Sequence, residues 1–350
     1  MIIPIFTPQG GCPERCNFCN QKISGGDPTS LQKITDTIEA HLKTRKHDEN
    51  VAIAFYGGTF TALSEQIQKR YLDAISPYFS MGVSSVRIAT RPDAISEPWI
   101  RFLKETYRLE TVELGVQSFN PKTLSSLGRT HSLDSVYSAV EVLKKQDIKT
   151  GLHLMVGCPE EEWAGPSHAL ELFKTHLERL RPDMIRIHPM LILKGTELEE
   201  RYHKGQFTPL SLEEAVERSA DLSEVAEELS IKVIRLGLQP NEIMEAGGIT
   251  AGPYHPAFGE MVKSKLYQRV IRSKITNLRG ETSDLDGELE IQVPSQALSA
   301  VLGQHKQNYF SLQSHFPLLK LKVSVLEGLP YSKRLSDNVS IRFYNTSRSS

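Results

Sequence analysis

The sequence has few of the features that mark exported or membrane-embedded proteins. Its 350 residues include only four cysteines, too few for the disulfide framework of a secreted scaffold. No apolar run approaches the roughly 20 residues that span a bilayer. The opening MIIPIF is too short for a signal peptide, and it lacks the flanking residues of one. These absences predict a cytoplasmic protein without membrane contact, in which thiols stay reduced.

A strong charge of either sign is also lacking. The formal net charge is -1, with 24% charged and 39% hydrophobic residues, as in an ordinary soluble protein. No global basic excess therefore forces a nucleic-acid partner, although local basic patches can still bind one. The length allows a well-buried core and two domains.

Three of the four cysteines gather in one short stretch, CPERCNFCN. Cys12, Cys16 and Cys19 have the spacing C-x3-C-x2-C. Clustered thiols in a reducing compartment more often hold a metal than form disulfides. Structural zinc is bound by four protein ligands, and the next histidine and cysteine in the chain are the distant His41 and Cys158. Three thiolates on a cubane iron–sulfur cluster leave one iron open. We therefore predict such a cluster; a zinc site completed by a distant ligand is the alternative.

Strand and helix patterns alternate through the first two thirds of the chain. Short apolar runs predict strands at residues 1–6, 51–56, 85–89, 111–115, 150–156 and 184–188. Helical periodicity follows each of them, at residues 31–44, 64–78, 97–106, 133–146, 166–180 and 212–229. The last helix opens with the capping box Ser211-x-x-Glu214. Six successive units predict an α/β fold, a partial (β/α)6 TIM-like barrel with its site at the C-terminal ends of the strands.

Distinctive motifs follow five of these strands. They are the cysteine loop, Gly57-Gly58-Thr59, Arg91-Pro92, Gln117 and Gly157-Cys158-Pro159, in chain order. Paired glycines let the backbone approach a ligand closely, although a tight turn without a ligand would also explain them. Because parallel strands end at one edge of a sheet, we expect these motifs to converge on one rim.

The pattern changes beyond residue 236. A Gly/Pro-rich stretch leads into a small α/β unit, with helical segments at 261–276 and 295–307 and strands at LEIQV, 319–325 and 339–344. We expect a barrel domain at residues 1–236, an auxiliary C-terminal domain at 237–345 and a frayed tail at 346–350.

One segment of this C-terminal part, KSKLYQRVIRSKITNLR, has six basic residues and no acidic one. It could be a phosphate-binding helix, with Tyr267 available for stacking. The favoured interpretation is a solvated amphipathic helix, neutralised by the acidic run ETSDLDGELE that follows. The cations concerned are Lys265, Arg269 and Arg272, or, on another face, Lys263 and Lys274.

The cysteine spacing, with Phe18 just before the last cysteine, resembles the cluster loop of the radical S-adenosylmethionine (SAM) superfamily. Residues 112–160, from VELGVQSFNPKTLSSLGRTHS to HLMVGCPEE, are similar to the radical half of the Elongator catalytic subunit, which modifies wobble uridines of transfer RNA. YGGTFTALS, TRPD and RIHPMLILKGTELEERYHKGQF extend this similarity over roughly residues 1–230. Oxygen-independent coproporphyrinogen III oxidases are a more distant match.

This resemblance implies an enzyme. A [4Fe-4S] cluster on Cys12, Cys16 and Cys19 would take an electron from an external donor and cleave SAM to methionine and a 5′-deoxyadenosyl radical. The cofactor-binding residues that it implies are Gly57, Gly58 and Thr59 for the amino group, Gln117 for the ribose, Arg129 for the carboxylate and His153 for the adenosine side. An amide suits a diol, and a guanidinium matches a carboxylate. A surface glutamine, a salt-bridged arginine and a satisfied core histidine are the alternatives.

The substrate implied by the resemblance is a base in RNA, with transfer RNA as a possible partner and the C-terminal domain as the docking surface. A small metabolite is the alternative, and a non-catalytic metal-binding or electron-transfer module is the alternative from a different class. Cys158 could donate a hydrogen atom, but packing as a small apolar residue is favoured.

Two departures from the related families limit the analogy. Ala89 stands where they commonly have a glutamate, so one polar contact to the cofactor is either missing or supplied elsewhere, with Thr90 as a candidate. The Elongator subunit has a wider gap between its first two cluster cysteines and ends in an acetyltransferase domain; this sequence has neither, so acetyl-coenzyme A chemistry is not carried over.

Overall fold

The computed structural model describes residues 1–7, 12, 16–20, 23, 29–46, 49–163, 168–239, 244–281, 287–328, 330–332 and 334–345. The chain divides into two compact units. The first comprises Met1–Ala215 and Glu228–Tyr254, and the second comprises Val216–Glu227 and His255–Ser350. No helix among the described residues is long and apolar enough to cross a membrane.

The first unit is built on a seven-stranded sheet in the order β1-β2-β3-β4-β5-β6-β8, in which every neighbouring pair is parallel. This confirms the predicted partial barrel. The strands are β1 Ile2–Phe6, β2 Val51–Tyr56, β3 Val83–Thr90, β4 Leu109–Gln117, β5 Lys149–Val156, β6 Met184–Pro189 and β8 Lys232–Leu236. Sequence patterns missed β8, because it is an edge strand without buried residues and charged side chains interrupt its apolar run.

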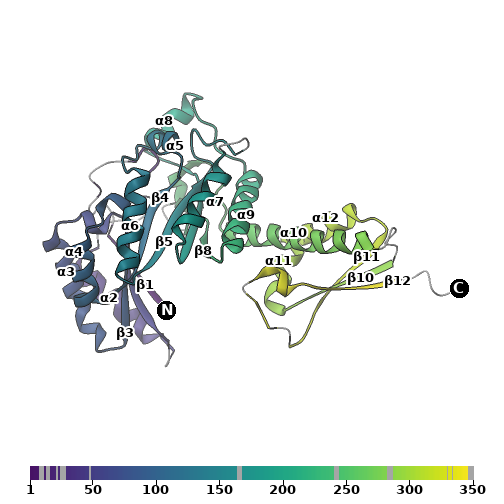
Figure 1. Cartoon of the computed structure of the whole chain (residues 1–350), viewed down its shortest axis with the longest axis horizontal. Coiled ribbons are helices and arrows are strands. Elements are labelled where there is room, and N and C mark those ends of the chain that lie inside the picture. Colours follow the sequence, from purple (N-terminus) through teal and green to yellow (C-terminus); the bar gives the residue numbers. More distant parts are fainter. Residues whose placement is uncertain are drawn as a thin grey trace. The chain divides into compact units, whose positions relative to one another are not determined.

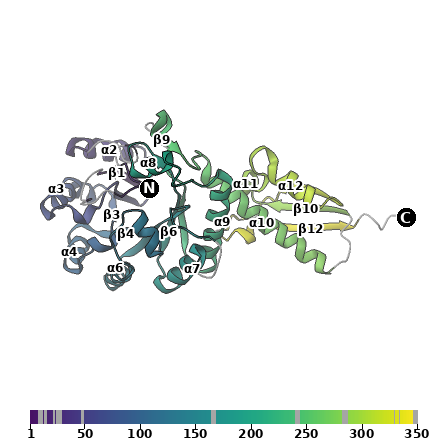
Figure 2. The ribbon, with the colours of Figure 1, turned by 90° about the horizontal axis from the view of Figure 1, so that it is seen from above.

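Helices cover the outer face of this sheet. Figure 2 shows α2, α3, α4, α6 and α7 outside the strands. Ser30, Ser64 and Ser132 cap three of them by accepting a backbone N–H of the first turn. The helices are α2 Leu31–Lys43, α3 Glu65–Ile75, α4 Glu97–Tyr107, α6 Leu133–Lys145 and α7 Ala169–Leu180. Two short helices escaped sequence prediction because neither is long enough to display a period: α5 Pro121–Ser126 and α8 Glu197–His203.

The two faces of the sheet differ in chemistry. On β4, Val112, Leu114 and Val116 are fully buried on one face, and alternation along a strand turns Glu113 and Gln117 to the other. A small antiparallel pair, β7 Ile192–Leu193 and β9 Ile249–Ala251, follows in the same unit. The apolar face therefore packs under the helices, and the inner face is free to carry polar groups.

The second unit is a small mixed sheet in the order β11-β10-β12, covered by helices on one face (Figure 1). Its elements are α10 Phe258–Glu281, β10 Gly287–Val293, α11 Leu298–Leu302, α12 Gln307–His315, β11 Leu319–Val325 and β12 Ser340–Asn345. This confirms a small C-terminal α/β arrangement. The helical segment predicted at 295–307 is instead divided, because Gly303 ends α11 with a φ of +73°.

Arg269 of the basic helix α10 pairs with acidic residues of the second unit, whereas residues 282–286 of the acidic run predicted to neutralise the helix lie outside the described residues. Arg269 contacts Glu217, Asp221 and Glu224 at 2.6–2.7 Å, all from α9 (Leu212–Glu228), which begins at the predicted capping box. Tyr267 is 1% exposed, so it is not available for stacking on bases, which was part of the less favoured alternative.

Candidate functional site

The cysteine loop lies against the end of β2. The Cys12 sulfur is 3.2 Å from the Thr59 hydroxyl oxygen. Thr59 is 2% exposed and follows the glycine pair, in which Gly57 has a φ of +105° that favours glycine. The first cysteine and the diglycine turn are thus brought together, as the parallel topology led us to expect.

The second half of the loop is anchored on the end of α5 through Asn17. Its backbone N–H donates to the Leu127 carbonyl at 3.0 Å and its side-chain amide to the Ser126 carbonyl at 3.1 Å. Gly128, with a φ of +67°, must remain glycine, because a Cβ there would lie 2.7 Å from the Asn17 side chain. Asn17 was not among the predicted site residues, although its place beside Cys16 in the motif was a signal.

The last two cysteines of the loop are joined by a turn, in which the Cys19 N–H donates to the Cys16 carbonyl at 3.0 Å. Phe18 packs on an apolar cluster that includes Leu127 and Cys158. All four cysteines are free of disulfides. In the part of the chain that the structure describes, no three His, Cys, Asp or Glu side chains converge closely enough to hold a metal ion.

Gln117 ends β4 in an unusual conformation. Its φ of +71° lies in the left-handed region, at a register irregularity between β4 and β5. Such a conformation costs about 1 kcal/mol or more for a residue other than glycine, and bulges of this kind re-aim side chains next to active sites. A Cβ added at Gly115 would lie 3.2 Å from the Gln117 amide nitrogen and 3.7 Å from Arg129 Nη2. Gly115 therefore leaves room for both side chains.

Arg129 links this strand end to the cysteine loop. Its Nη2 donates to the Gly115 carbonyl at 2.5 Å, and its Nη1 lies 3.6 Å from the Cys16 sulfur. Its Nε donates to Nδ1 of His131 at 3.3 Å. Burial, with a further contribution from the charge of Arg129, lowers the pKa of His131 to about 4, so the ring is a neutral acceptor at neutral pH. His131, two residues after Arg129, was also missed by the sequence analysis.

The motif after β3 is held mainly by its own neighbours. The guanidinium of Arg91, which is 6% exposed, donates to both oxygens of Asp93 and to the Thr130 hydroxyl at 2.8 Å. Thr90, the possible substitute for the missing glutamate, shares a 2.6 Å hydrogen bond with Thr61.

The inner face of the sheet carries a buried carboxylate that the sequence analysis did not single out. Glu113 is 0% exposed and accepts hydrogen bonds from Tyr56, Arg87, His153 and Arg186 at 2.5–3.1 Å. Burial alone would raise its pKa, but these hydrogen bonds and charges hold the pKa far below its usual range. The available signal was a set of charged residues inside otherwise apolar strands.

His153, predicted for the adenosine side of a cofactor, lies within this network. Its Nε2 is 2.8 Å from Glu113, and its ring centre is 5.8 Å from that of His188. Cys158 is 4% exposed, and burial raises its thiol pKa, in keeping with a small packed residue.

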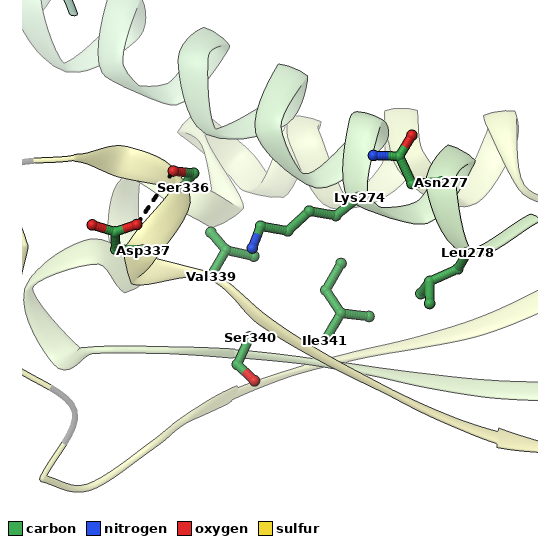
Figure 3. Close-up of a pocket in the computed structure, with 8 residues that line it drawn as sticks. All are labelled: Lys274, Asn277, Leu278, Ser336, Asp337, Val339, Ser340 and Ile341. Atoms are coloured by element: carbon green, nitrogen blue, oxygen red, sulfur yellow. Dashed lines mark hydrogen bonds between the residues drawn. The ribbon is translucent and has the colours of Figure 1, made fainter.

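A separate cavity of about 470 Å³ lies in the second unit (Figure 3). Among the described residues that line it, Lys274 and Asp337 are charged and none is a cysteine or a histidine. It is lined by Lys274, Asn277, Leu278, Ser336, Asp337, Val339, Ser340 and Ile341. We assign no chemistry to this cavity.

Comparison with known proteins agrees with the fold and with the cysteine motif. The chain is 26% identical over 318 residues to the tRNA uridine(34) acetyltransferase of Methanocaldococcus infernus, covering 79% of this chain and 58% of that protein. It is 26% identical over 247 residues to human Elongator complex protein 3, covering 61% of this chain and 44% of that protein. The chain thus spans about half the length of these relatives.

A solved structure of the archaeal Methanocaldococcus infernus Elp3 with an N-terminal deletion superposes with a TM-score of 0.58 at 25% identity, covering 78% of this chain and 63% of that one. The sequence model of the radical SAM superfamily matches residues 6–173, and the model of the Radical_SAM C-terminal domain matches residues 182–268. The chain therefore belongs to the radical SAM superfamily, whose enzymes use a [4Fe-4S] cluster and S-adenosylmethionine.

Proposed function

We propose that this radical SAM enzyme modifies a base in RNA, with transfer RNA as the first candidate. The observation that carries the proposal is the similarity to a tRNA uridine(34) acetyltransferase over 79% of this chain. The acetyltransferase activity in that name is not transferred, because the chain covers only 58% of that relative.

The three loop cysteines would hold the cluster, since thiolates are its usual ligands and three of them leave one iron open. Support comes from the position of the loop, with Cys12 against Thr59 and Cys16 against Arg129. When bound and reduced, the cluster and S-adenosylmethionine supply a 5′-deoxyadenosyl radical that takes a hydrogen atom from the substrate. The protein positions the reactants and excludes water.

The remaining residues would orient the cofactor. Arg129, whose Nη1 lies 3.6 Å from the Cys16 sulfur, would receive the carboxylate, and Gln117 would contact the ribose. The backbone of Gly57, Gly58 and Thr59 would accept the amino group, and His153 would line the adenosine side.

The test has two stages. Anaerobically reconstituted protein with dithionite and S-adenosylmethionine should release 5′-deoxyadenosine, and Cys16→Ala should abolish that release. Modified nucleosides of transfer RNA should then be compared by mass spectrometry in cells with and without the gene. A missing or altered nucleoside supports the proposal. Unchanged nucleosides, with no effect of transfer RNA on 5′-deoxyadenosine release, would favour a small-metabolite substrate.

A further inference from the structure

The inner face of the first unit carries more positive than negative charge. Arg87 and Arg186 both donate to Glu113, at 2.8 Å and 2.5 Å. Arg235 of β8 is in register with Arg186 of β6, so their side chains leave the same face of the sheet. Within the described ranges, Glu113 is the one carboxylate that pairs with any of these three guanidinium groups.

Glu113 has no capacity left to neutralise a third cation. Both of its oxygens already accept hydrogen bonds, including those from Tyr56 and His153. Arg235 donates instead to the carbonyls of Gly237 at 3.3 Å and Leu238 at 3.2 Å. Burial and the neighbouring positive charge of Arg186, its partner in register, lower the pKa of Arg235.

Hydrogen-bond donors are also in surplus here. The Arg87 side chain is 13% exposed, and its Nε is buried without an acceptor among the described residues. Arginine keeps its proton in proteins, so this charge cannot be removed by titration. Arg87 is paired with Glu113, but its orphaned Nε donor is still costly. A bound anion would supply an acceptor for that donor and would balance the charge of Arg235, which is unpaired among the described residues.

This charged layer lies below the rim position of Gln117, and it includes His153, the residue predicted for the adenosine side of the cofactor. Glu113 precedes Gln117 by four positions on β4, which is about 13 Å along a strand. Gly115 lies between them and projects no side chain. An anion held by the arginines around Glu113 would therefore lie deeper on the inner face than a group held by Gln117 and Arg129.

We propose that Arg87, Arg186 and Arg235 form a subsite for an oxyanion of the substrate, with Glu113 fixing the first two guanidinium groups. The planar donor fork of arginine matches both carboxylate and phosphate. The oxyanion can be the phosphate of a nucleotide or the carboxylate of a small organic acid. This inference rests on the proposed function, because it describes the substrate of the same site.

The test is calorimetric titration of the reconstituted protein with inorganic phosphate and, separately, with acetate, at constant ionic strength set by chloride and with S-adenosylmethionine present. We expect saturable binding of at least one probe. Arg235→Gln should weaken it about tenfold, the loss of one charged hydrogen bond. The matched control is Arg70→Gln, an exposed arginine of α3, which should change nothing.

The two probes distinguish between a phosphate and a carboxylate as the oxyanion of the substrate. Binding of phosphate alone assigns the subsite to a nucleotide, and binding of acetate alone assigns it to a small carboxylic acid. Absence of saturable binding to either overturns the inference. So does binding that S-adenosylmethionine displaces, or binding that Arg235→Gln leaves unchanged in protein with wild-type iron content and circular dichroism. The nucleoside comparison does not depend on these titrations, so either proposal can fail while the other stands.

Discussion

The hydroxyl of Thr59 lies 3.2 Å from the sulfur of Cys12, although 47 positions separate the two residues. A hydrogen bond to a cluster sulfur stabilises the reduced, more negative state and so raises the reduction potential. We predict that Thr59→Val lowers the cluster potential by about 40 mV, equivalent to one hydrogen bond of about 1 kcal/mol. The reduction potential of the cluster is measured by redox titration, with electron paramagnetic resonance as the readout. Thr61→Val, which removes a bond to Thr90, is the control.

The four cysteines should separate into two kinds when each is replaced by alanine. Cys19→Ala should remove the cluster, because two thiolates remain. Cys158→Ala should retain it, because this buried thiol packs among apolar side chains, and the variant should lose about 1 kcal/mol of unfolding free energy. Iron and sulfide content, with urea unfolding, distinguishes them. Loss of iron from Cys158→Ala would make this cysteine a ligand.

Gly115 should tolerate alanine in the fold but not in cofactor binding. The added methyl group would lie 3.2 Å from the Gln117 amide nitrogen and 3.7 Å from Arg129 Nη2. We predict that Gly115→Ala raises the KM for S-adenosylmethionine about tenfold with unchanged iron content, the equivalent of about 1.4 kcal/mol. Gly205→Ala is the control: nothing lies within 4 Å of its added methyl group, so it should leave KM unchanged. An unaltered KM in Gly115→Ala would count against the assignment of Gln117 and Arg129.

Sequence patterns could predict the sheet and its rim, because buried parallel strands are continuous apolar runs that end at one edge. They could not predict β8, where Arg235 interrupts the run on an exposed edge. Nor could they assign partners to Glu113, which depend on how β2, β3, β5 and β6 bring their side chains together in space. The same holds for Arg269, whose acceptor Glu217 is 52 positions away. Local sequence patterns therefore could not predict contacts between residues that are far apart in the chain.

His131 should make the stability of the first unit depend on pH. Its pKa is about 4 when folded and about 6.5 when unfolded, so only the unfolded state binds a proton between these values. The contribution of the neutral His131 ring to the unfolding free energy is therefore complete above pH 6.5. As the pH falls toward 4, the unfolding free energy decreases by up to about 1.4 kcal/mol per pH unit. Asp93, Arg91 and Arg129 also face the ring.

The measurement is urea unfolding of wild type and His131→Gln between pH 7 and pH 4.5. The glutamine oxygen can still accept a hydrogen bond from Arg129, so the variant should fold. Its unfolding free energy should depend less steeply on pH than that of wild type. Equal slopes in the two proteins would mean that the imidazole does not stay neutral in the folded state.

Arg269 should stabilise the second unit rather than bind a ligand. It is the shared partner of Glu217, Asp221 and Glu224, which occupy one face of α9. Removing the guanidinium takes the shared partner from three neighbouring carboxylates, of which Glu217 keeps its ion pair with Lys265. We predict that Arg269→Met, which keeps the apolar stem, lowers the unfolding free energy by about 1–2 kcal/mol, a modest value because these groups are partly exposed.

Three comparisons make this prediction specific, all by urea unfolding. Arg272→Met should change the unfolding free energy by less than about 0.5 kcal/mol, because Arg272 is exposed. Adding Asp221→Asn to Arg269→Met should recover part of the loss, because one repelling charge is removed. High salt should narrow the difference between wild type and Arg269→Met, because it screens both the pairs and the repulsion. If Arg269→Met is as stable as wild type at low salt, the three contacts contribute no net stability, and the charge of Arg269 is available for a ligand such as RNA.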